Sequence, residues 1–436
     1  MHLIQDIIAK HKSGNHAGIF SNCSANEYVL RAVMRRCKAK GIPALIEATA
    51  NQVNQDGGYT GQTPKDFYDW CQNLAKQEDF DPSMLILGGD HLGPLTWTRL
   101  HEAEAMAKAE RLIYEYVYAG FTKIHIDTSM HLASDDPNRR LSDAVIARRG
   151  AALCAVAEQA FAHRKKEVPN AVSPIYVIGS EVPIPGGALE QEALGVTSRE
   201  NCLATIAAFH QAFEERGLYD AWKRIVAVVV QPGVEFSEDD VFVYDSEKAR
   251  DLCQSIKDQP FAFEGHSTDY QPRPALYEMV RDGIVILKVG PALTFALREA
   301  LFALEHVEKI LLRGRGIALS GFADALETAM LEHPGNWNKH YHGDGFKQRI
   351  NRAYGFSDRA RYYLNQPMVQ EAIDRLVANL DGPVPLPLLS QFMPVQYANV
   401  RDGLIENKVD TLILDRVGDY IDDYIFALEH TPETGA

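Results

Sequence analysis

An acid and an imidazole stand side by side at positions 90 and 91, directly after a short apolar run and two glycines. The carboxylate of Asp90 can exchange protons with a substrate, and the neutral ring of His91 can bind a metal ion. Two such groups at the end of a buried strand are more typical of a reaction site than of a structural one. We therefore expect the chemistry of this protein to centre on these two residues.

Seven other apolar runs in the first 300 residues are also followed by polar side chains. Each run is four to six residues long, the length of a strand, and is hydrophobic almost throughout. This pattern predicts strands of a parallel sheet that is covered on both faces. The eight expected strands are 18–21, 43–47, 84–88, 123–127, 175–178, 225–230, 261–264 and 284–288.

Segments with helical periodicity separate these runs, for example 104–117, 147–161 and 203–213. Eight strand and helix repeats within 300 residues predict an α/β fold of the (β/α)8 TIM-barrel type. A doubly wound open sheet remains an alternative, because periodicity does not distinguish a closed sheet from an open one.

The pattern changes near residue 300, after which helical segments dominate. We expect two domains, a barrel over 1–300 and a helical C-terminal extension over 301–436 that packs on it. The helices expected near or within the extension are 299–312, 323–332, 358–363 and 369–380, with an ordered turn at 383–387 and a strand-like run at 412–414.

Residues that follow the strands of a parallel barrel meet at one end of it, although they lie far apart in the sequence. A single polar residue at such a position is often an ordinary loop cap, but here almost every strand end is polar. We therefore predict one shared site. Its candidate residues are Glu47, Asn51, Asp90, His91, Asp127, Glu181, Gln231, Glu264, His266, Ser267, Thr268, Lys288 and Gly290.

Two imidazoles and a carboxylate among these residues can hold a divalent metal ion and leave positions for a substrate oxygen. The predicted ligands are His91, Glu264 and His266, and Gln231 can supply a further oxygen. The ion is Zn, Ni, Mn or Mg. Ordinary hydrogen-bonding histidines are the alternative, since no pair has the helical His-x-x-x-His spacing.

Small and hydroxyl residues follow the last two strands, at 265–268 and 289–294. Backbone N–H groups at such turns can bind the phosphate of a substrate at a helix N-terminus. Two ordinary turns explain the same residues equally well. Arg359 and Arg361 can add positive charge from the extension, although an exposed helical face explains them more simply.

Composition limits the classes of partner. The 436-residue chain is 46% hydrophobic and 24% charged, and its net charge of -15 repels nucleic acid and anionic lipid, so we expect neither nucleic acid nor membrane binding. Six dispersed cysteines and an N-terminus without a signal-like segment predict a reduced, cytoplasmic protein. We also expect a homo-oligomer.

Six segments closely resemble the GatZ/KbaZ-like family, and the similarity extends over nearly the whole chain. That family comprises the partner subunit of class II D-tagatose-1,6-bisphosphate aldolase and related ketohexose-phosphate epimerases. A more distant resemblance links Asp90-His91 to the acid and ligand histidine of catalytic class II aldolases. It places Glu264 and Gln231 where those enzymes have ligand histidines. The six segments are 46–61, 88–94, 176–183, 229–236, 265–271 and 286–300.

The resemblance implies two alternative functions. One is 4-epimerisation between fructose 6-phosphate and tagatose 6-phosphate by retro-aldol chemistry. In this hypothesis Asp90 exchanges the hydroxyl proton, and Glu181 and Asp127 orient hydroxyls or shuttle a second proton. The other is a non-catalytic subunit that stabilises and activates a catalytic aldolase subunit. We favour the enzyme, because charged strand ends without a chemical role would cost stability. A kinase is disfavoured because the sequence has no Gly-x-x-x-x-Gly-Lys-Ser/Thr loop.

Overall fold

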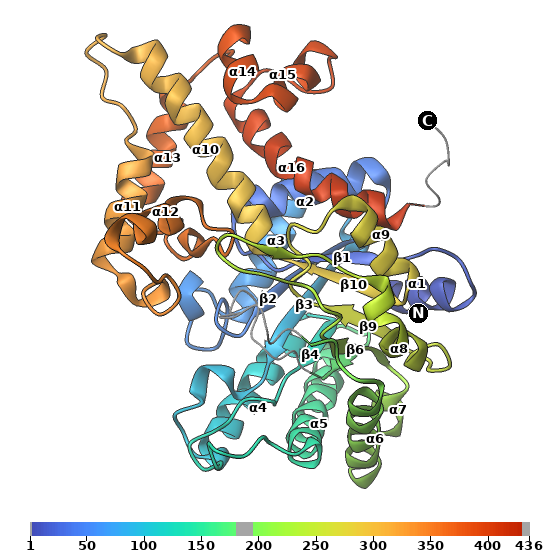
Figure 1. The fold of residues 1–436 in the computed structure, drawn as a ribbon. Coiled ribbons are helices and arrows are strands. Elements are labelled where there is room, and N and C mark those ends of the chain that lie inside the picture. The colour runs from blue at the N-terminus through green and yellow to red at the C-terminus, as the bar shows by residue number, and fades with distance from the viewer. Residues whose placement is uncertain (1, 180–194, 430–436) are drawn as a thin grey trace.

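Eight parallel strands form a closed barrel in the computed structural model, which describes residues 2–179 and 195–429 (Figure 1). The last barrel strand pairs with the first, with Ser21 opposite Lys288, so the sheet has no edge. This closure confirms the predicted barrel and excludes the open sheet. The strands are β1 Ile19–Asn22, β2 Ala44–Thr49, β3 Leu85–Leu92, β4 Lys123–Ile126, β5 Ile175–Ile178, β6 Ile225–Val230, β9 Ala262–Gly265 and β10 Ile284–Val289.

Helices surround the barrel, and most of them begin at a side chain that caps the first backbone N–H groups. Asn26, Ser142 and Ser198 each accept a backbone N–H in this way, and Thr63 forms a capping box with Asp66. The surrounding helices are α2 Glu27–Lys40, α3 Pro64–Gln77, α4 Glu102–Ala119, α5 Asp143–Glu167, α6 Arg199–Glu215, α7 Tyr219–Trp222, α8 Ser246–Ser255, α9 Arg273–Arg281 and α10 Pro291–Leu312.

Short elements complete the loops between strands and helices. They are the 3-10 turns η1 Gly58–Thr60, η2 Pro82–Met84 and η3 Pro94–Trp97, and the two-stranded ribbon of β7 Glu235–Phe236 and β8 Val241–Phe242.

The N-terminal helix α1 (Leu3–Lys12) lies against the end of the barrel opposite to the strand carboxyl ends. Its Ile4 and Ile8 are buried with strand residues such as Leu45 and Ile86, so the lower half of the barrel is apolar. The candidate site residues lie toward the other end of the barrel, where the strands have their carboxyl ends.

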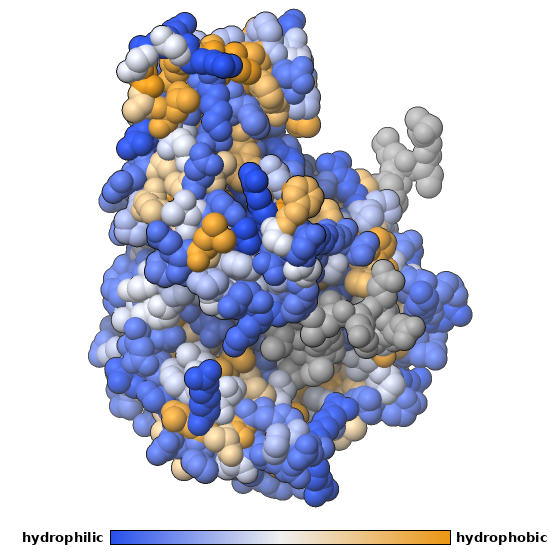
Figure 2. Space-filling model, turned by 60° about the vertical axis from the view of Figure 1, so that its left-hand side comes forward, coloured by the Kyte–Doolittle hydropathy of each residue, from blue (hydrophilic) through white to orange (hydrophobic). Residues whose placement is uncertain are grey.

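The extension begins as α10 runs past the barrel, and it continues through five short helices and two 3-10 turns (Figure 1). Apolar side chains are exposed on it, including Phe346, Leu386 and Leu404, and Figure 2 shows such side chains gathered near its outer end. These elements are α11 Phe322–Glu332, η4 Pro334–Asn336, α12 Gly345–Tyr354, η5 Arg359–Tyr362, α13 Pro367–Asn379, α14 Leu386–Phe392 and α15 Pro394–Arg401.

The chain then returns to the barrel as the long helix α16 (Val409–Leu428), which contacts α2, α9, α10 and β1. The strand predicted at 412–414 is therefore wrong. Leu412 and Ile413 belong to the apolar face of this helix, together with Val417 and Ile421, and that face is buried. In the part of the chain that the structure describes, no helix has the length and apolar character needed to cross a membrane.

Candidate active site

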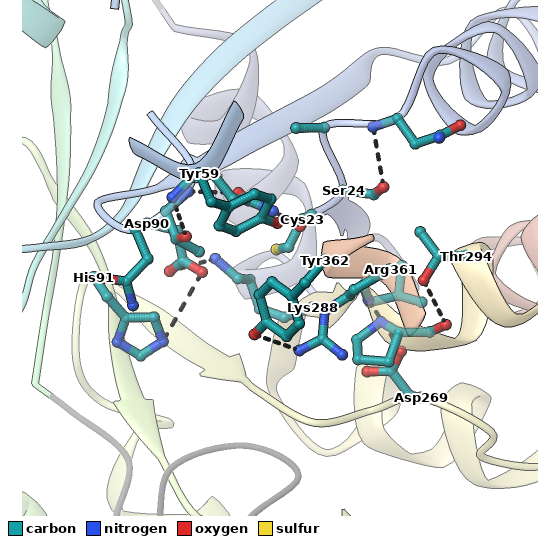
Figure 3. A pocket seen from close by; sticks show the side chains of 18 of the residues that line it. Cys23, Ser24, Tyr59, Asp90, His91, Asp269, Lys288, Thr294, Arg361 and Tyr362 are labelled. Carbon is teal, nitrogen blue, oxygen red and sulfur yellow. Dashed lines mark hydrogen bonds and ion pairs between the residues drawn. The ribbon is translucent and has the colours of Figure 1, made fainter. Parts of the chain in front are cut away.

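A pocket lies at the carboxyl ends of the barrel strands, and the 3-10 turn η5 of the extension forms part of its wall (Figure 3). Barrel and extension both line it, because η5 packs against α10 and the β2–α3 loop, where the rings of Tyr59 and Tyr362 meet edge to face at 5.0 Å. The lining residues include Cys23, Ser24, Asn51, Asp90, His91, His266, Ser267, Asp269, Lys288, Gly290, Arg361 and Tyr362.

Four side chains at one end of this pocket form a group that can hold a metal ion. Ligand atoms of Asp90, His91, His125 and His266 all lie within 4.8 Å of one another. Two of the three predicted ligands, His91 and His266, belong to this group, and the predicted acid Asp90 joins them. The roles themselves remain predictions.

His125 is the member that the sequence analysis left without a role. It lies in β4, where polar and apolar residues alternate as Lys123, Ile124, His125 and Ile126. Alternate residues of a strand point to the same face, so Lys123 and His125 both project into the barrel. This alternation was a usable signal, but it is too short to stand out within an apolar run.

The ring of His91 is held by Asp127. The His91 backbone adopts φ 48°, a left-handed conformation that histidine tolerates better than most residues. Its Nδ1 lies 2.8 Å from Asp127 Oδ2. Burial raises the pKa of Asp127, but the hydrogen bond and charge of His91 outweigh it and lower that pKa to about 2. The ionised carboxylate therefore accepts the proton of Nδ1, which leaves Nε2 of His91 to act as a ligand.

His125 is oriented by a backbone carbonyl. Its Nε2 donates to Gly179 O at 3.0 Å, so its Nδ1 carries a lone pair, and the His91 backbone N–H donates to that nitrogen. The same Nδ1 lies 2.9 Å from Asp90 Oδ1. An acceptor nitrogen this close to a carboxylate oxygen favours a cation beside both atoms.

His266 and Glu264, which were both predicted to bind the metal ion, are hydrogen-bonded to each other. Glu264 Oε1 accepts a hydrogen bond from His266 Nε2 at 3.0 Å, and its Oε2 lies 2.6 Å from Lys123 Nζ. Burial lowers the pKa of His266 to about 3, so the ring is neutral near pH 7. The geometry thus gives Glu264 the position of a carboxylate that orients a ligand histidine, rather than that of a ligand.

Two buried lysines and two buried glutamates form a charged layer beneath the imidazoles. Lys123 contacts both oxygens of Glu47, at 2.7 and 2.8 Å, and Lys288 lies 3.2 Å from Glu47. Gly88 makes room for this layer, since a Cβ there would come within 2.8 Å of Glu47 Cγ. All four charged side chains are at most 5% exposed, so the layer is buried.

Lys288 connects this layer to Asp90, because its Nζ lies 2.6 Å from Asp90 Oδ1 (Figure 3). Burial raises the pKa of Asp90, but the charges of Lys288 and His91 outweigh it and hold that pKa well below its usual value. Asp90 is therefore a carboxylate at neutral pH, which is the form that accepts a proton.

The charges of the site suit a divalent cation. Within the described residues, the site contains four carboxylates and two ammonium groups. The carboxylates are those of Glu47, Asp90, Asp127 and Glu264, and the ammonium groups are those of Lys123 and Lys288. The two carboxylates in excess of the ammonium groups are costly in a buried volume. Burial lowers the pKa of His91, but the charge of Asp90 and the hydrogen bond and charge of Asp127 outweigh it and raise that pKa, which shows the same excess of negative charge. The donor set of imidazole and carboxylate also fits such an ion.

The family model of D-tagatose-1,6-bisphosphate aldolase subunits GatZ/KbaZ-like matches residues 4–429 of this chain. The chain belongs to this family. A crystal structure from Sinorhizobium meliloti 1021, described as a probable tagatose 6 phosphate kinase, is 44% identical. Its TM-score is 0.85, and the match covers 94% of this GatZ/KbaZ-like chain and 100% of that one.

Two aldolases of known structure are similar to this GatZ/KbaZ-like chain only at a low level. Fructose-bisphosphate aldolase from Campylobacter jejuni is 14% identical with a TM-score of 0.41, over 87% of this chain and 91% of that one. The YdjI aldolase from Escherichia coli K12 is 11% identical with a TM-score of 0.38, over 85% and 98%. Neither similarity is used to assign the site, whose residues are identified from the distances given above.

Some of the remaining predicted site residues of this GatZ/KbaZ-like chain line the pocket, and others are buried beside it. Asn51, Ser267 and Gly290 line the pocket. Gln231 is buried, and its side-chain oxygen accepts the backbone N–H groups of Gly233 and Val234.

Thr268 donates its hydroxyl proton to the Lys288 carbonyl and is fully buried, so it supports the turn without lining the pocket. Glu181 lies outside the described residues.

Proposed function

We propose that this protein is a metal-dependent ketohexose-phosphate enzyme that interconverts fructose 6-phosphate and tagatose 6-phosphate. The observation that carries the proposal is the environment of Asp90. An ionised carboxylate lies among three imidazoles and beside the ammonium of Lys288, at the edge of a pocket that is open to a small molecule.

Epimerisation at C4 of a 2-ketose needs more than removal of a C–H proton, because the C2 carbonyl acidifies only the hydrogen on C3. Cleavage of the C3–C4 bond solves this problem. Loss of the proton on the C4 hydroxyl lets the C3–C4 electron pair move toward C2, which gives an enediolate and an aldehyde. The aldehyde turns over and re-adds through its other face, and the new C4 oxygen regains the proton.

The chain's own residues supply the proton transfer and the positioning in this scheme. Asp90 accepts the proton of the C4 hydroxyl and returns it after re-addition. Lys288 keeps Asp90 ionised, and Asp127 fixes the ring of His91. Glu181, by the resemblance, orients a hydroxyl or moves a second proton.

The metal-capable group has a defined part in the proposal. His91, His125 and His266, with Asp90 beside them, would hold a Zn, Ni, Mn or Mg ion. Such an ion supplies positive charge that polarises the C2 carbonyl and stabilises the negative charge that develops there.

An accessory role is the second candidate, because the family description names an aldolase subunit. Exposed apolar side chains such as Leu386 and Leu404 on the extension offer a surface that a catalytic partner subunit could contact. The kinase description of the Sinorhizobium meliloti relative suits this chain less well, since the sequence lacks a Gly-x-x-x-x-Gly-Lys-Ser/Thr phosphate loop.

One assay separates the two candidates. The purified full chain, freed of metal and then given Mg2+, Mn2+, Ni2+ or Zn2+ in turn, should interconvert fructose 6-phosphate and tagatose 6-phosphate with no other protein present. No turnover with any of the four ions, combined with activation of a tagatose-bisphosphate aldolase catalytic subunit when the two are mixed, would establish the accessory role instead.

A further inference from the structure

The turn after the last barrel strand is already occupied by an anion of the protein itself. Asp269 Oδ1 accepts the backbone N–H groups of Gly290 and Ala292, at 3.0 and 2.8 Å, at the N-terminus of α10. Asp269 is 2% exposed. The N–H groups expected to bind a substrate phosphate therefore have a carboxylate partner, and that carboxylate repels a second anion at the same place.

Arg361 offers a different anion site in the same pocket. It comes from η5, and its guanidinium donates to the carbonyls of Ser357 and Asp358 and to the Tyr362 hydroxyl (Figure 3). Across residues 2–179 and 195–429, no carboxylate lies within ion-pair distance of this guanidinium, and no other arginine lines the pocket.

A second cationic group, Arg359, lies beside it and has no ion pair with a carboxylate among the residues that the structure describes. Arg359 is 8% exposed, its Nη1 donates to the Asn336 carbonyl, and its Nε has no hydrogen-bond partner. Burial and the charge of Arg361 lower the pKa of Arg359. Burial and the charges of both arginines also lower the pKa of His340 to about 4.

Within residues 2–179 and 195–429, neither Arg361 nor Arg359 makes a direct ion pair with a carboxylate, although burial of Arg361 is outweighed by Tyr362, Tyr59 and Asp358, which raise its pKa. Arg298 on α10, which is 1% exposed, is by contrast neutralised by Asp358 at 2.8 Å. The net charge of the chain is -15, so acidic partners are abundant. Two adjacent guanidinium groups left without one favour an external anion that bears two charges.

We propose that Arg361, with Arg359 behind it, binds the phosphate of the substrate, so that the barrel holds the reacting carbons and the extension holds the phosphate. Figure 3 shows Arg361 on the opposite side of Lys288 from His91, which places the two ends of a sugar phosphate along one pocket. This proposal deepens the proposed function, and it predicts a preference for a phosphorylated ketohexose over a free ketohexose or a hexuronate.

Calorimetric titration of the full chain tests the proposal by measuring binding, a readout that does not depend on the rate of turnover. Inorganic phosphate, fructose 6-phosphate, fructose and a hexuronate are titrated into wild type, Arg361→Gln, Arg361→Lys and Arg349→Gln. Arg349 is exposed on α12 and serves as the matched control. Arg361→Gln should weaken binding of phosphate and of fructose 6-phosphate about 10- to 100-fold, with Arg361→Lys in between and Arg349→Gln unchanged.

Fructose binding reports whether Arg361→Gln keeps the fold and the barrel end of the pocket, and it should be the same as in wild type. Equal affinity of wild type and Arg361→Gln for phosphate, or tighter binding of the hexuronate than of fructose 6-phosphate, would overturn the proposal. Arg361-dependent phosphate binding in a chain that does not epimerise would leave this site standing and remove the epimerase.

Discussion

Asp90 is the residue on which the proposed chemistry depends, because two opposing effects act on its protonation. Burial alone would raise its pKa and keep it protonated, whereas Lys288 and the neighbouring histidines lower its pKa strongly. The charges around Asp90 therefore keep it ionised, as a proton acceptor, despite its burial.

Replacing Asp90 by Asn removes the proton acceptor with almost no change in side-chain size. We expect kcat for the interconversion of fructose 6-phosphate and tagatose 6-phosphate to fall at least about 100-fold, the usual contribution of a general base. The circular dichroism spectrum should not change. Asp251→Asn, on the exposed surface of α8, is the control, and activity close to wild type in Asp90→Asn would exclude the mechanism.

Lys123 has a structural role rather than a chemical one. It neutralises Glu47 and Glu264 and does not line the pocket. Lys123→Met leaves two carboxylates buried beneath the imidazoles without this partner. We expect the free energy of unfolding in urea to fall by about 3 to 5 kcal/mol. Lys38→Met, which removes an exposed pair with Asp79, should leave that free energy almost unchanged, and similar losses in both variants would contradict the argument.

At the scale of elements, the His2 cap of helix α1 should make the stability of the fold depend on pH. His2 Nδ1 accepts the backbone N–H of Ile4, and its Nε2 contacts the Thr122 hydroxyl. Burial lowers the pKa of His2 to about 4. A folded-state pKa below the unfolded value of 6.5 means that the neutral ring stabilises the fold above pH 6.5, and that this contribution is lost as the pH falls toward 4.

His2→Asn keeps a capping side chain but removes the titration. Between pH 7 and pH 4 we expect the free energy of unfolding of wild type to fall by about 3 kcal/mol more than that of the variant. His101→Asn is the control, because His101 occupies the same position before α4 without making a cap hydrogen bond. Parallel pH profiles for wild type and His2→Asn would refute the assignment.

At the scale of the whole molecule, the chain returns to the barrel after the extension, so we expect the two parts to unfold together. Arg36 on α2 pairs with Asp415 on α16 at 2.8 Å, and the Tyr424 hydroxyl donates to the Thr268 carbonyl beside the pocket. Barrel and extension therefore contact each other through α16 as well as through η5 at the pocket, and a ligand bound in the pocket should stabilise both together.

A metal ion that binds the Asp90 and histidine group should accordingly raise the unfolding temperature of the entire chain in a single transition. At a free ion concentration 100 times Kd, linkage predicts about 2.7 kcal/mol of added stability. Differential scanning calorimetry with each of the four ions, followed by a chelator, measures this. His91→Asn should abolish the shift and His210→Asn, an exposed histidine, should preserve it; a shift that survives His91→Asn would place the ion elsewhere.

Much of the fold could be predicted from local patterns. All eight strand runs correspond to barrel strands, because a strand covered on both faces needs a continuous apolar run. The run at 412–414 failed for the same reason, since three apolar residues on a buried helix face look identical to a short strand. The polar ends of the strands could also be located, which brought Asp90, His91 and His266 together in advance.

The sequence by itself determined where the strands end and which residue types follow them. Only the tertiary structure decided which of those residues contact one another and which of them line the pocket. It grouped His125 with the metal-capable side chains, gave Glu264 to Lys123 and His266, closed the α10 N-terminus with Asp269, and brought Arg361 into the pocket from the extension. These outcomes depend on side-chain direction, register and the return of distant segments, which arise from packing and leave at most a weak local signal, such as the alternation around His125.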